Sequence, residues 1–236
     1  MSLHLMPLTL SQTPPMAQTP WQKFLYRLRQ HFLLKCVGTS VFITVFFMAY
    51  LWLLKNPQFA VTVMPLTPVD RAIAFEPAAL AIYATLWFYV SIPPAFLAVR
   101  TELYQYGTAI GMVCAIGLSV FFFWPTAVPP ALIDFNAHPG FAFLKSIDAA
   151  GNACPSLHVA TAVFSGIWLH RMLLEIGASR RSRLINALWC AAIVYSTLAT
   201  KQHVAVDVAA GTALGWLGAW TALLWRARTH GPAGRA

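Results

Sequence analysis

The sequence predicts an all-α, polytopic membrane protein, a six-transmembrane-helix bundle, and three observations lead to that prediction. The chain is strongly apolar, since 58% of its 236 residues are hydrophobic and the mean hydropathy is +0.63. Only 10% of the residues are charged, against about 25% in ordinary globular proteins. The charges are also clustered, so that long uncharged stretches separate them.

Each uncharged stretch is long enough for one membrane crossing. The hydrocarbon core of a bilayer is about 30 Å thick and needs roughly 20 helical residues. The stretches without Lys, Arg, Asp or Glu are 36–54, 77–99, 103–133, 149–170, 184–200 and 208–225. We expect one helix in each, with Pro93 and Pro94 kinking or ending the second helix and Pro125 helping to end the third.

Little of the chain is left for a separate soluble domain. We expect residues 36–226 to form the membrane domain and residues 227–236 to form a C-terminal tail. Residues 1–20 are rich in Pro, Thr, Ser and Gln and contain no Lys or Arg, so they are expected to be disordered. Residues 21–35 form a basic amphipathic lead-in, which fits a helix in the lipid headgroup layer as well as an ordinary cytoplasmic segment.

The basic residues predict the orientation of the chain. If the N-terminus is cytoplasmic, 12 of the 16 Lys and Arg lie on the inner side, where positively charged loops are favoured. The four on the outer side are Lys55, Arg71, Lys145 and Lys201. We therefore expect an integral protein of a bacterial inner membrane, with both termini in the cytoplasm and the outer loops in the periplasm.

The same charges indicate the partners. The net charge of +9 does not indicate nucleic-acid binding, because the basic residues flank the spans and form no patch interleaved with exposed aromatic residues. The lipid bilayer, with its anionic headgroups, is the expected partner. Four scattered Cys without a C-x-x-C pair predict neither a disulfide framework nor a metal site, and we expect no metal or cofactor. The sequence does not indicate an oligomeric state.

Three ionisable residues lie at the ends of apolar segments, in N-A-C-P-S-L-H-V-A at 152–160 and T-K-Q-H-V-A-V-D at 200–207. They are His158, His203 and Asp207. A charge placed centrally in a span costs roughly 2.5–3.5 kcal/mol on insertion scales, so such residues indicate function. The fourth span runs inward and the fifth returns outward over a similar length. Because both arms rise by about 1.5 Å per residue, His158 and His203 should lie at the same depth near the outer surface.

Structural roles are a real alternative for these residues. Asp207 follows His203 by four residues, on one helix face, and this pair alone fits a polar contact between helices as well as it fits chemistry. A single His158 is more often structural. All three at one depth, beside Ser156 and Lys201, favour a catalytic site.

The two segments resemble those of the type 2 phosphatidic acid phosphatase superfamily. Pro155, Ser156 and His158 match its Pro-Ser-x-His segment, and His203 and Asp207 match its His-x3-Asp segment. Looser similarity at 65–77 and 124–130 extends the resemblance over most of the chain after residue 60. The branch it suggests contains the inositol phosphorylceramide synthases and related lipid phosphotransferases, which have a six-helix membrane core.

The resemblance implies a role for each residue. His203 would attack phosphorus and form a phosphohistidine, Asp207 would orient and stabilise its imidazole, and His158 would protonate the leaving alkoxide. The substrate would be a membrane lipid phosphate, and the reaction would be hydrolysis or transfer to an alcohol such as inositol. Ser156 and the first N–H groups of the fourth span would bind the phosphoryl oxygens.

The chain departs from the family's phosphatases in its cations. It has no upstream Lys-x6-Arg-Pro motif, and Thr197 stands where those enzymes have Arg, six residues before the nucleophilic histidine. Lys201 is the first candidate to supply the charge, as in the synthase-like branch. Lys145 and Arg71 are the further candidates for binding the phosphate.

Three other functions fit parts of the pattern. A His/Asp-based membrane transporter could use the same residues as a proton or metal relay, although no ionisable residue continues the path to the inner side. A catalytically inactive, lipid-binding relative would explain the missing arginines. An intramembrane serine protease would need a Gly-x-Ser-Gly segment, of which only F-S-G at 164–166 is present.

Overall fold

The fold confirms the prediction of a helical membrane protein. The structure, a computed structural model, describes residues 20–131, 133–138, 140–141 and 151–230. In this part of the chain six helices are long and apolar enough to cross a membrane. They are α2 (Phe32–Lys55), α4 (Ala79–Ala84) continued by α5 (Leu86–Phe96), α6 (Arg100–Phe123), α8 (Leu157–Glu175), α9 (Arg180–Ala199) and α10 (Ala205–His230). Lys145 and residues 1–19 of the predicted N-terminal tail lie outside the described residues, and of the predicted C-terminal tail residues 227–230 are described, as the last part of α10.

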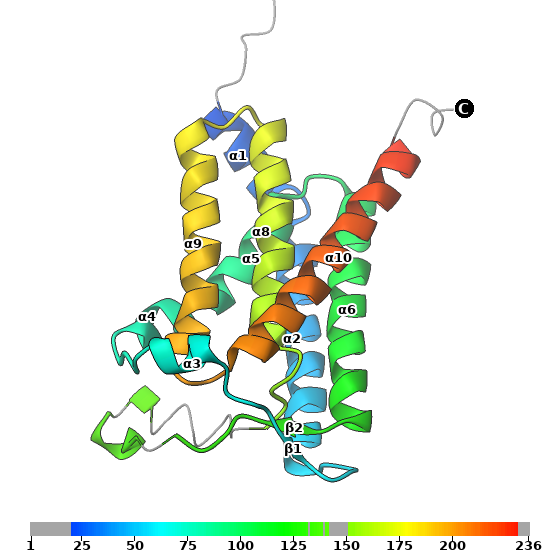
Figure 1. Cartoon of the computed structure of the whole chain (residues 1–236). Coiled ribbons are helices and arrows are strands. Elements are labelled where there is room, and N and C mark those ends of the chain that lie inside the picture. Colours follow the sequence, from blue (N-terminus) through cyan, green and yellow to red (C-terminus); the bar gives the residue numbers. More distant parts are fainter. Residues whose placement is uncertain (1–19, 132, 139, 142–150, 231–236) are drawn as a thin grey trace, which may run out of the picture.

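The lead-in is divided into two helices. A short amphipathic helix, α1 (Pro20–Arg29), lies at one end of the bundle (Figure 1), and α2 begins at Phe32, four residues before the predicted span. His31 separates them in a left-handed conformation, with φ 53°. We call this end of the molecule the α1 end and the opposite one the loop end.

The second span is broken at Thr85, which the sequence pattern did not predict. There the Thr85 N–H donates to the carbonyl oxygen of Ile82, three residues back, at 3.0 Å, as in a 3₁₀ turn. The Thr85 hydroxyl donates to the same carbonyl at 2.6 Å and accepts from Trp189 Nε1 of α9 at 2.9 Å. Helix α4 lies at the loop end beside the end of α9, and α5 continues obliquely from it into the bundle (Figure 1). Pro93 and Pro94 lie in the last turns of α5, which ends at Phe96.

Close contact between α8 and α10 forms the centre of the bundle. The Gly211-x3-Gly215 spacing in the sequence predicts a face where helix backbones can approach closely, and the structure has such a contact. A Cβ at Gly211 would overlap the carbonyl oxygen of Ser156, and one at Gly215 that of Ala160. Apolar side chains of α6, α8 and α10 fill the rest of this core, among them Phe164 and Trp168. The start of α10 is thereby held against the start of α8.

Polar contacts close the α1 end. Arg226 of α10 donates to Glu102 of α6 and to Glu175 of α8, each at 2.5 Å. The buried ammonium of Lys35 on α2 donates to Ala95 O (2.9 Å) at the end of α5, where carbonyl groups lack helical partners. These contacts hold five helices together at the end opposite to the site described below.

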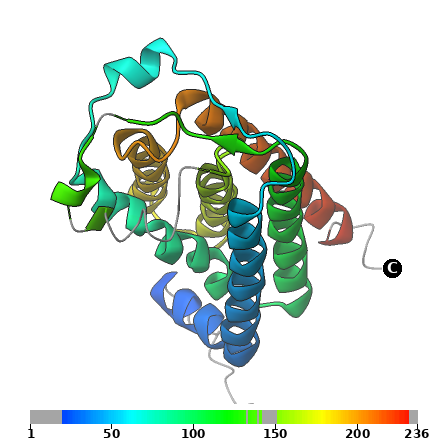
Figure 2. The same cartoon turned by 90° about the horizontal axis from the view of Figure 1, so that it is seen from below.

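A layer of connecting segments covers the loop end. Strand β1 (Thr62–Val63) pairs in parallel with β2 (Thr126–Ala127), which joins the segment after α2 to the segment after α6. Helix α3 (Pro68–Ala72) follows β1, and a 3₁₀ turn, η1 (Phe135–Ala137), follows β2. Seen from below in Figure 2, this layer lies beside the beginning of α10.

Candidate active site

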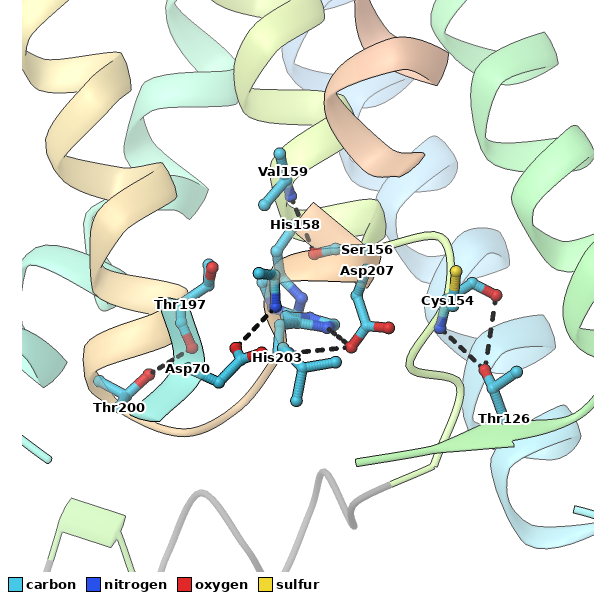
Figure 3. Close-up of polar contacts among 12 residues, drawn as sticks. Asp70, Thr126, Cys154, Ser156, His158, Val159, Thr197, Thr200, His203 and Asp207 are labelled. Atoms are coloured by element: carbon cyan, nitrogen blue, oxygen red, sulfur yellow. Dashed lines mark hydrogen bonds and ion pairs between the residues drawn. The ribbon is translucent and has the colours of Figure 1, made fainter. Parts of the chain in front are cut away.

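The two histidines meet at the loop end (Figure 3). His158 is the second residue of α8, and His203 lies in the turn that joins α9 to α10. Their ring centroids are 5.6 Å apart. The antiparallel arrangement of α8 and α9 thus brings the two rings to one place, as the equal lengths of the two arms require.

Asp207 lies against the second of these rings. Its side chain is fully buried, and His203 is 7% exposed. Asp207 Oδ2 is 3.5 Å from His203 Nδ1 and accepts a hydrogen bond from the Val204 N–H at 3.0 Å. The first distance is ion-pair range and longer than an ordinary N–H···O bond, but catalytic contacts without substrate are often long. With Nδ1 turned to the carboxylate, Nε2 is the nitrogen left for a substrate.

The turn before His203 has a defined helix-ending geometry. Lys201 is left-handed, with φ 55°, and its N–H donates to Leu198 O at 3.1 Å. The N–H of Gln202 and that of His203 both donate to Thr197 O at 3.1 Å. This is the pattern of a Schellman motif, which usually has glycine at the left-handed position. A lysine there is strained, and strained residues persist where surrounding contacts hold them.

Those contacts come from α3. The Lys201 ammonium donates to the backbone oxygens of Asp70 (3.1 Å) and Ile73 (2.5 Å). The Asp70 carboxylate in turn accepts from the Ala205 N–H at 2.7 Å and from the N–H and hydroxyl of Thr67. Both residues therefore tie α3 to the turn that carries His203. Thr67-x2-Asp70 could be recognised in the sequence as a capping box, but its contact with residue 205 could not.

Ser156 links the start of α8, which carries His158, to the start of α10, which carries Asp207. It is the N-cap of α8, where its hydroxyl accepts from the Val159 N–H at 3.3 Å, and its own N–H donates to Asp207 O at 3.1 Å. The side chain is fully buried. The first N–H groups of a helix have no partner within it, so the backbone at Leu157 and His158 offers donors beside the two rings.

The predicted phosphate-binding cations differ in their placement. Lys201 lies in the turn beside His203, and two of its three ammonium hydrogens are directed to carbonyl groups. Arg71 is exposed on α3, next to Asp70. Lys145 lies outside the described residues.

Two aromatic residues beside the site had no signal in the sequence. The hydroxyl of Tyr83, on α4, lies 2.7 Å from Nε2 of His158, and the two ring centroids are 4.9 Å apart. Trp87 of α5 presents its ring edge-on to the same imidazole at 5.8 Å. Both aromatic residues fall in an uncharged span, where nothing in the pattern separates them from core residues.

The cysteine nearest to the site is not suited to act as a nucleophile. Cys154 is buried, and its N–H donates to Thr126 Oγ1 at 2.8 Å. Burial, with a smaller effect of the Asp207 charge, raises the pKa of its thiol to about 11. The thiolate, which is the reactive form, is therefore scarce at neutral pH.

A cavity of about 660 Å³ opens beside His158. It lies between α2, α5 and α6, and its lining is mostly apolar, with Tyr83 and Thr161 near the site and Lys35 at the far end. From Lys35 to Tyr50, both of which line it, α2 rises by roughly 22 Å at about 1.5 Å per residue. The cavity thus follows the membrane-crossing direction from the site toward the α1 end.

Histidine and aspartate side chains could also hold a metal ion. Within the described ranges, no group of three or more His, Cys, Asp and Glu side chains is arranged as a metal ligand set.

Together these features define a six-helix membrane protein with a His-His-Asp cluster at one end of the bundle. A family model described as the PAP2 superfamily matches residues 61–221. The match covers more than half of the chain, and it includes both histidine segments, so the protein belongs to the PAP2 superfamily. Members of this superfamily are typically phosphatases. Neither curated proteins nor solved structures gave a match to the chain.

Proposed function

We propose that the chain is an enzyme that acts on membrane lipid phosphates through a phosphohistidine intermediate. The observation that supports this best is the pair of imidazoles, 5.6 Å apart, of which His203 has a buried carboxylate beside it. Covalent catalysis needs a nucleophile that is oriented by a neighbouring group, here the carboxylate, and a separate group that transfers protons. Membership of the PAP2 superfamily agrees with the proposal.

In the first step His203 Nε2 attacks phosphorus. A P–N bond forms, the P–O bond to the lipid alcohol breaks, and His158 donates a proton to the departing oxygen. The phosphorylated imidazole carries positive charge, which the Asp207 carboxylate stabilises from the side of Nδ1.

In the second step the P–N bond breaks. Water or an alcohol attacks the phosphohistidine, and His158 takes up the proton that the attacking oxygen loses, so the enzyme returns to its starting state. Water gives a phosphatase, and an alcohol such as inositol gives a phosphotransferase of the inositol phosphorylceramide synthase type. We propose the transferase branch as the closer relative because Lys201 occupies the position expected there.

The phosphoryl oxygens need neutralising groups, since phosphoryl transfer depends mostly on positioning and electrostatics. The N–H groups at the start of α8 and the remaining hydrogen of the Lys201 ammonium are the nearest donors. Arg71 can add charge from the loop layer, and Lys145, outside the described residues, stays a further candidate. The same loop layer would face the outer side of the membrane, given the distribution of Lys and Arg.

The apolar cavity supports a lipid as the substrate. It adjoins His158 and follows the bilayer direction, so a hydrocarbon chain can lie in it while the phosphate stays at the two rings. Because lipid tails are already in an apolar medium, the cavity would position the chain rather than supply a hydrophobic driving force.

The proposal is tested with purified protein in detergent. Phosphate release from phosphatidic acid and other lipid phosphates is measured with and without inositol as acceptor. We expect His203→Ala to lower turnover by several orders of magnitude. His170→Ala, an exposed histidine at the far end of α8, is the matched control and should retain wild-type turnover. Undiminished turnover by folded His203→Ala would refute the proposal.

A further inference from the structure

We infer that Tyr83 is a positioning residue for His158, and that it determines which ring nitrogen transfers the proton. The inference rests on the proposed function, in which His158 is the acid for the leaving group. It concerns a residue that no sequence motif identifies.

The contact geometry restricts the imidazole to one orientation. The Tyr83 hydroxyl lies 2.7 Å from His158 Nε2, and Tyr83 is only 3% exposed. The Tyr83 ring lies 4.9 Å from the imidazole at an angle of 31°, and Trp87 lies edge-on at 5.8 Å. With two aromatic rings against it and a hydrogen bond at Nε2, the imidazole has little freedom to turn about χ2.

An imidazole has two nitrogens, and the partner of one decides the task of the other. Because Nε2 is bound to Tyr83, Nδ1 is the nitrogen left for the substrate oxygen. Nε2 then keeps its proton through the cycle and donates it to the Tyr83 oxygen. Nδ1 gives a proton to the lipid alkoxide in the first step and takes one from water or alcohol in the second.

The two histidines therefore have partners of different charge. Asp207 is an anion, and it suits a ring that becomes positively charged when phosphorylated. Tyr83 is a neutral group, so it orients His158 without an opposite charge that would hold the proton back from the leaving oxygen. This difference assigns the nucleophile and the acid within a pair of otherwise equal imidazoles.

A contact with α9 holds the end of the helix that carries Tyr83. Thr85 ends α4 two residues after Tyr83, and its hydroxyl accepts from Trp189 of α9. This bond fixes α4 against α9 at the loop end (Figure 1).

The test compares two substrates that differ in the need for an acid. Phosphatidic acid has a lipid alkoxide as leaving group, which must be protonated, whereas the nitrophenolate of 4-nitrophenyl phosphate leaves without a proton. We expect Tyr83→Phe to lower kcat for phosphatidic acid about 10–100-fold, by analogy with the loss of a group that orients a metal-binding histidine. The initial burst of nitrophenol, which reports phosphorylation of His203, should stay close to that of the wild type, because nitrophenolate leaves without an acid.

Tyr89→Phe is the matched control. Tyr89 is fully buried and its hydroxyl donates to Asn186 Oδ1 at 2.7 Å, away from both imidazoles. This variant loses a comparable hydroxyl and should keep wild-type values for both substrates. His158→Ala should repeat the Tyr83→Phe pattern with a larger loss.

Two results would overturn the inference: unchanged turnover of phosphatidic acid by Tyr83→Phe, or an equal loss in the nitrophenol burst, which indicates a general distortion of the site. Failure of the proposed function itself looks different. In that case the wild-type protein forms no phosphoenzyme with either substrate, and the premise of the inference is lost with it.

Discussion

Replacing Asp207 with asparagine removes one charge from the site and little else. The amide has the size of the carboxylate, and its oxygen can still accept from the Val204 N–H, which holds the first turn of α10. What is lost is the anion 3.5 Å from His203 Nδ1, at the moment when the ring becomes positively charged.

The size of the effect follows from that distance. Two unit charges 3.5 Å apart interact by about 5 kcal/mol at an effective dielectric constant of ~20. Each ~1.4 kcal/mol of transition-state stabilisation changes the rate tenfold, so we expect kcat to fall by about three orders of magnitude. A serine protease triad loses ~10⁴-fold on the same substitution through the wrong tautomer, which is of similar size.

The assay is phosphate release from phosphatidic acid, with monodispersity and thermal unfolding as checks of the fold. Glu102→Gln is the matched control, because it makes the same chemical change in a carboxylate that binds Arg226 at the α1 end. It should lower the unfolding temperature and leave kcat near that of the wild type. If Asp207→Asn keeps more than a tenth of the wild-type kcat, the carboxylate does not stabilise a charged His203 and the mechanism is wrong.

Further predictions concern the cavity, the packing, the ion pairs and the thiol. Gly107→Leu, at a position where added atoms meet open cavity space, should reduce turnover of long-chain lipid phosphates but not of 4-nitrophenyl phosphate; lipid-facing Ile116→Phe on the same helix is its control. Gly215→Val should prevent folding or strongly lower the unfolding temperature, because its Cβ overlaps a carbonyl oxygen of α8. Arg226→Ala should destabilise the bundle by about 3 kcal/mol, measured by denaturation, since it removes the cation that pairs with the partly buried Glu102, whereas Glu175 keeps Arg171. Cys154 has a pKa raised to about 11, so it stays a neutral thiol below that pH; its alkylation by iodoacetamide in the folded protein should be slow at pH 8 and rise toward pH 11, and fast labelling at pH 8 would contradict this.

The parts of the fold that could be predicted from the sequence depend on local, additive properties. The length of an uncharged stretch predicts a membrane span. The helical rise over the fourth and fifth spans, which are of similar length, brings His158 and His203 to one depth. The spacing of Gly211 and Gly215 likewise predicts a close helix contact, because only the two residues themselves decide how near a backbone can come. These predictions needed no knowledge of which other residues lie nearby.

The parts that could not be predicted depend on contacts between distant segments. Tyr83 contacts His158, 75 residues further along the chain, and the helix end next to it is held by Trp189, more than 100 residues away. Lys201 was expected to serve the phosphate, and its contacts with α3 became visible only with the left-handed turn that directs its ammonium there. The role of Lys201 in anion binding stays a prediction.

The polar cluster and the apolar cavity meet at His158, and this meeting restricts what the site can accept. The imidazole of His158 faces His203 within the cluster, and it also lines the cavity. A soluble phosphate ester would use the cluster and leave the cavity without a ligand, and a neutral lipid would use the cavity and leave the nucleophile without an electrophile. Only a molecule with both parts, a phosphate joined to a long hydrocarbon chain, fills both at once, and its ester oxygen then lies where the cluster adjoins the cavity, beside the ring that we propose to protonate it.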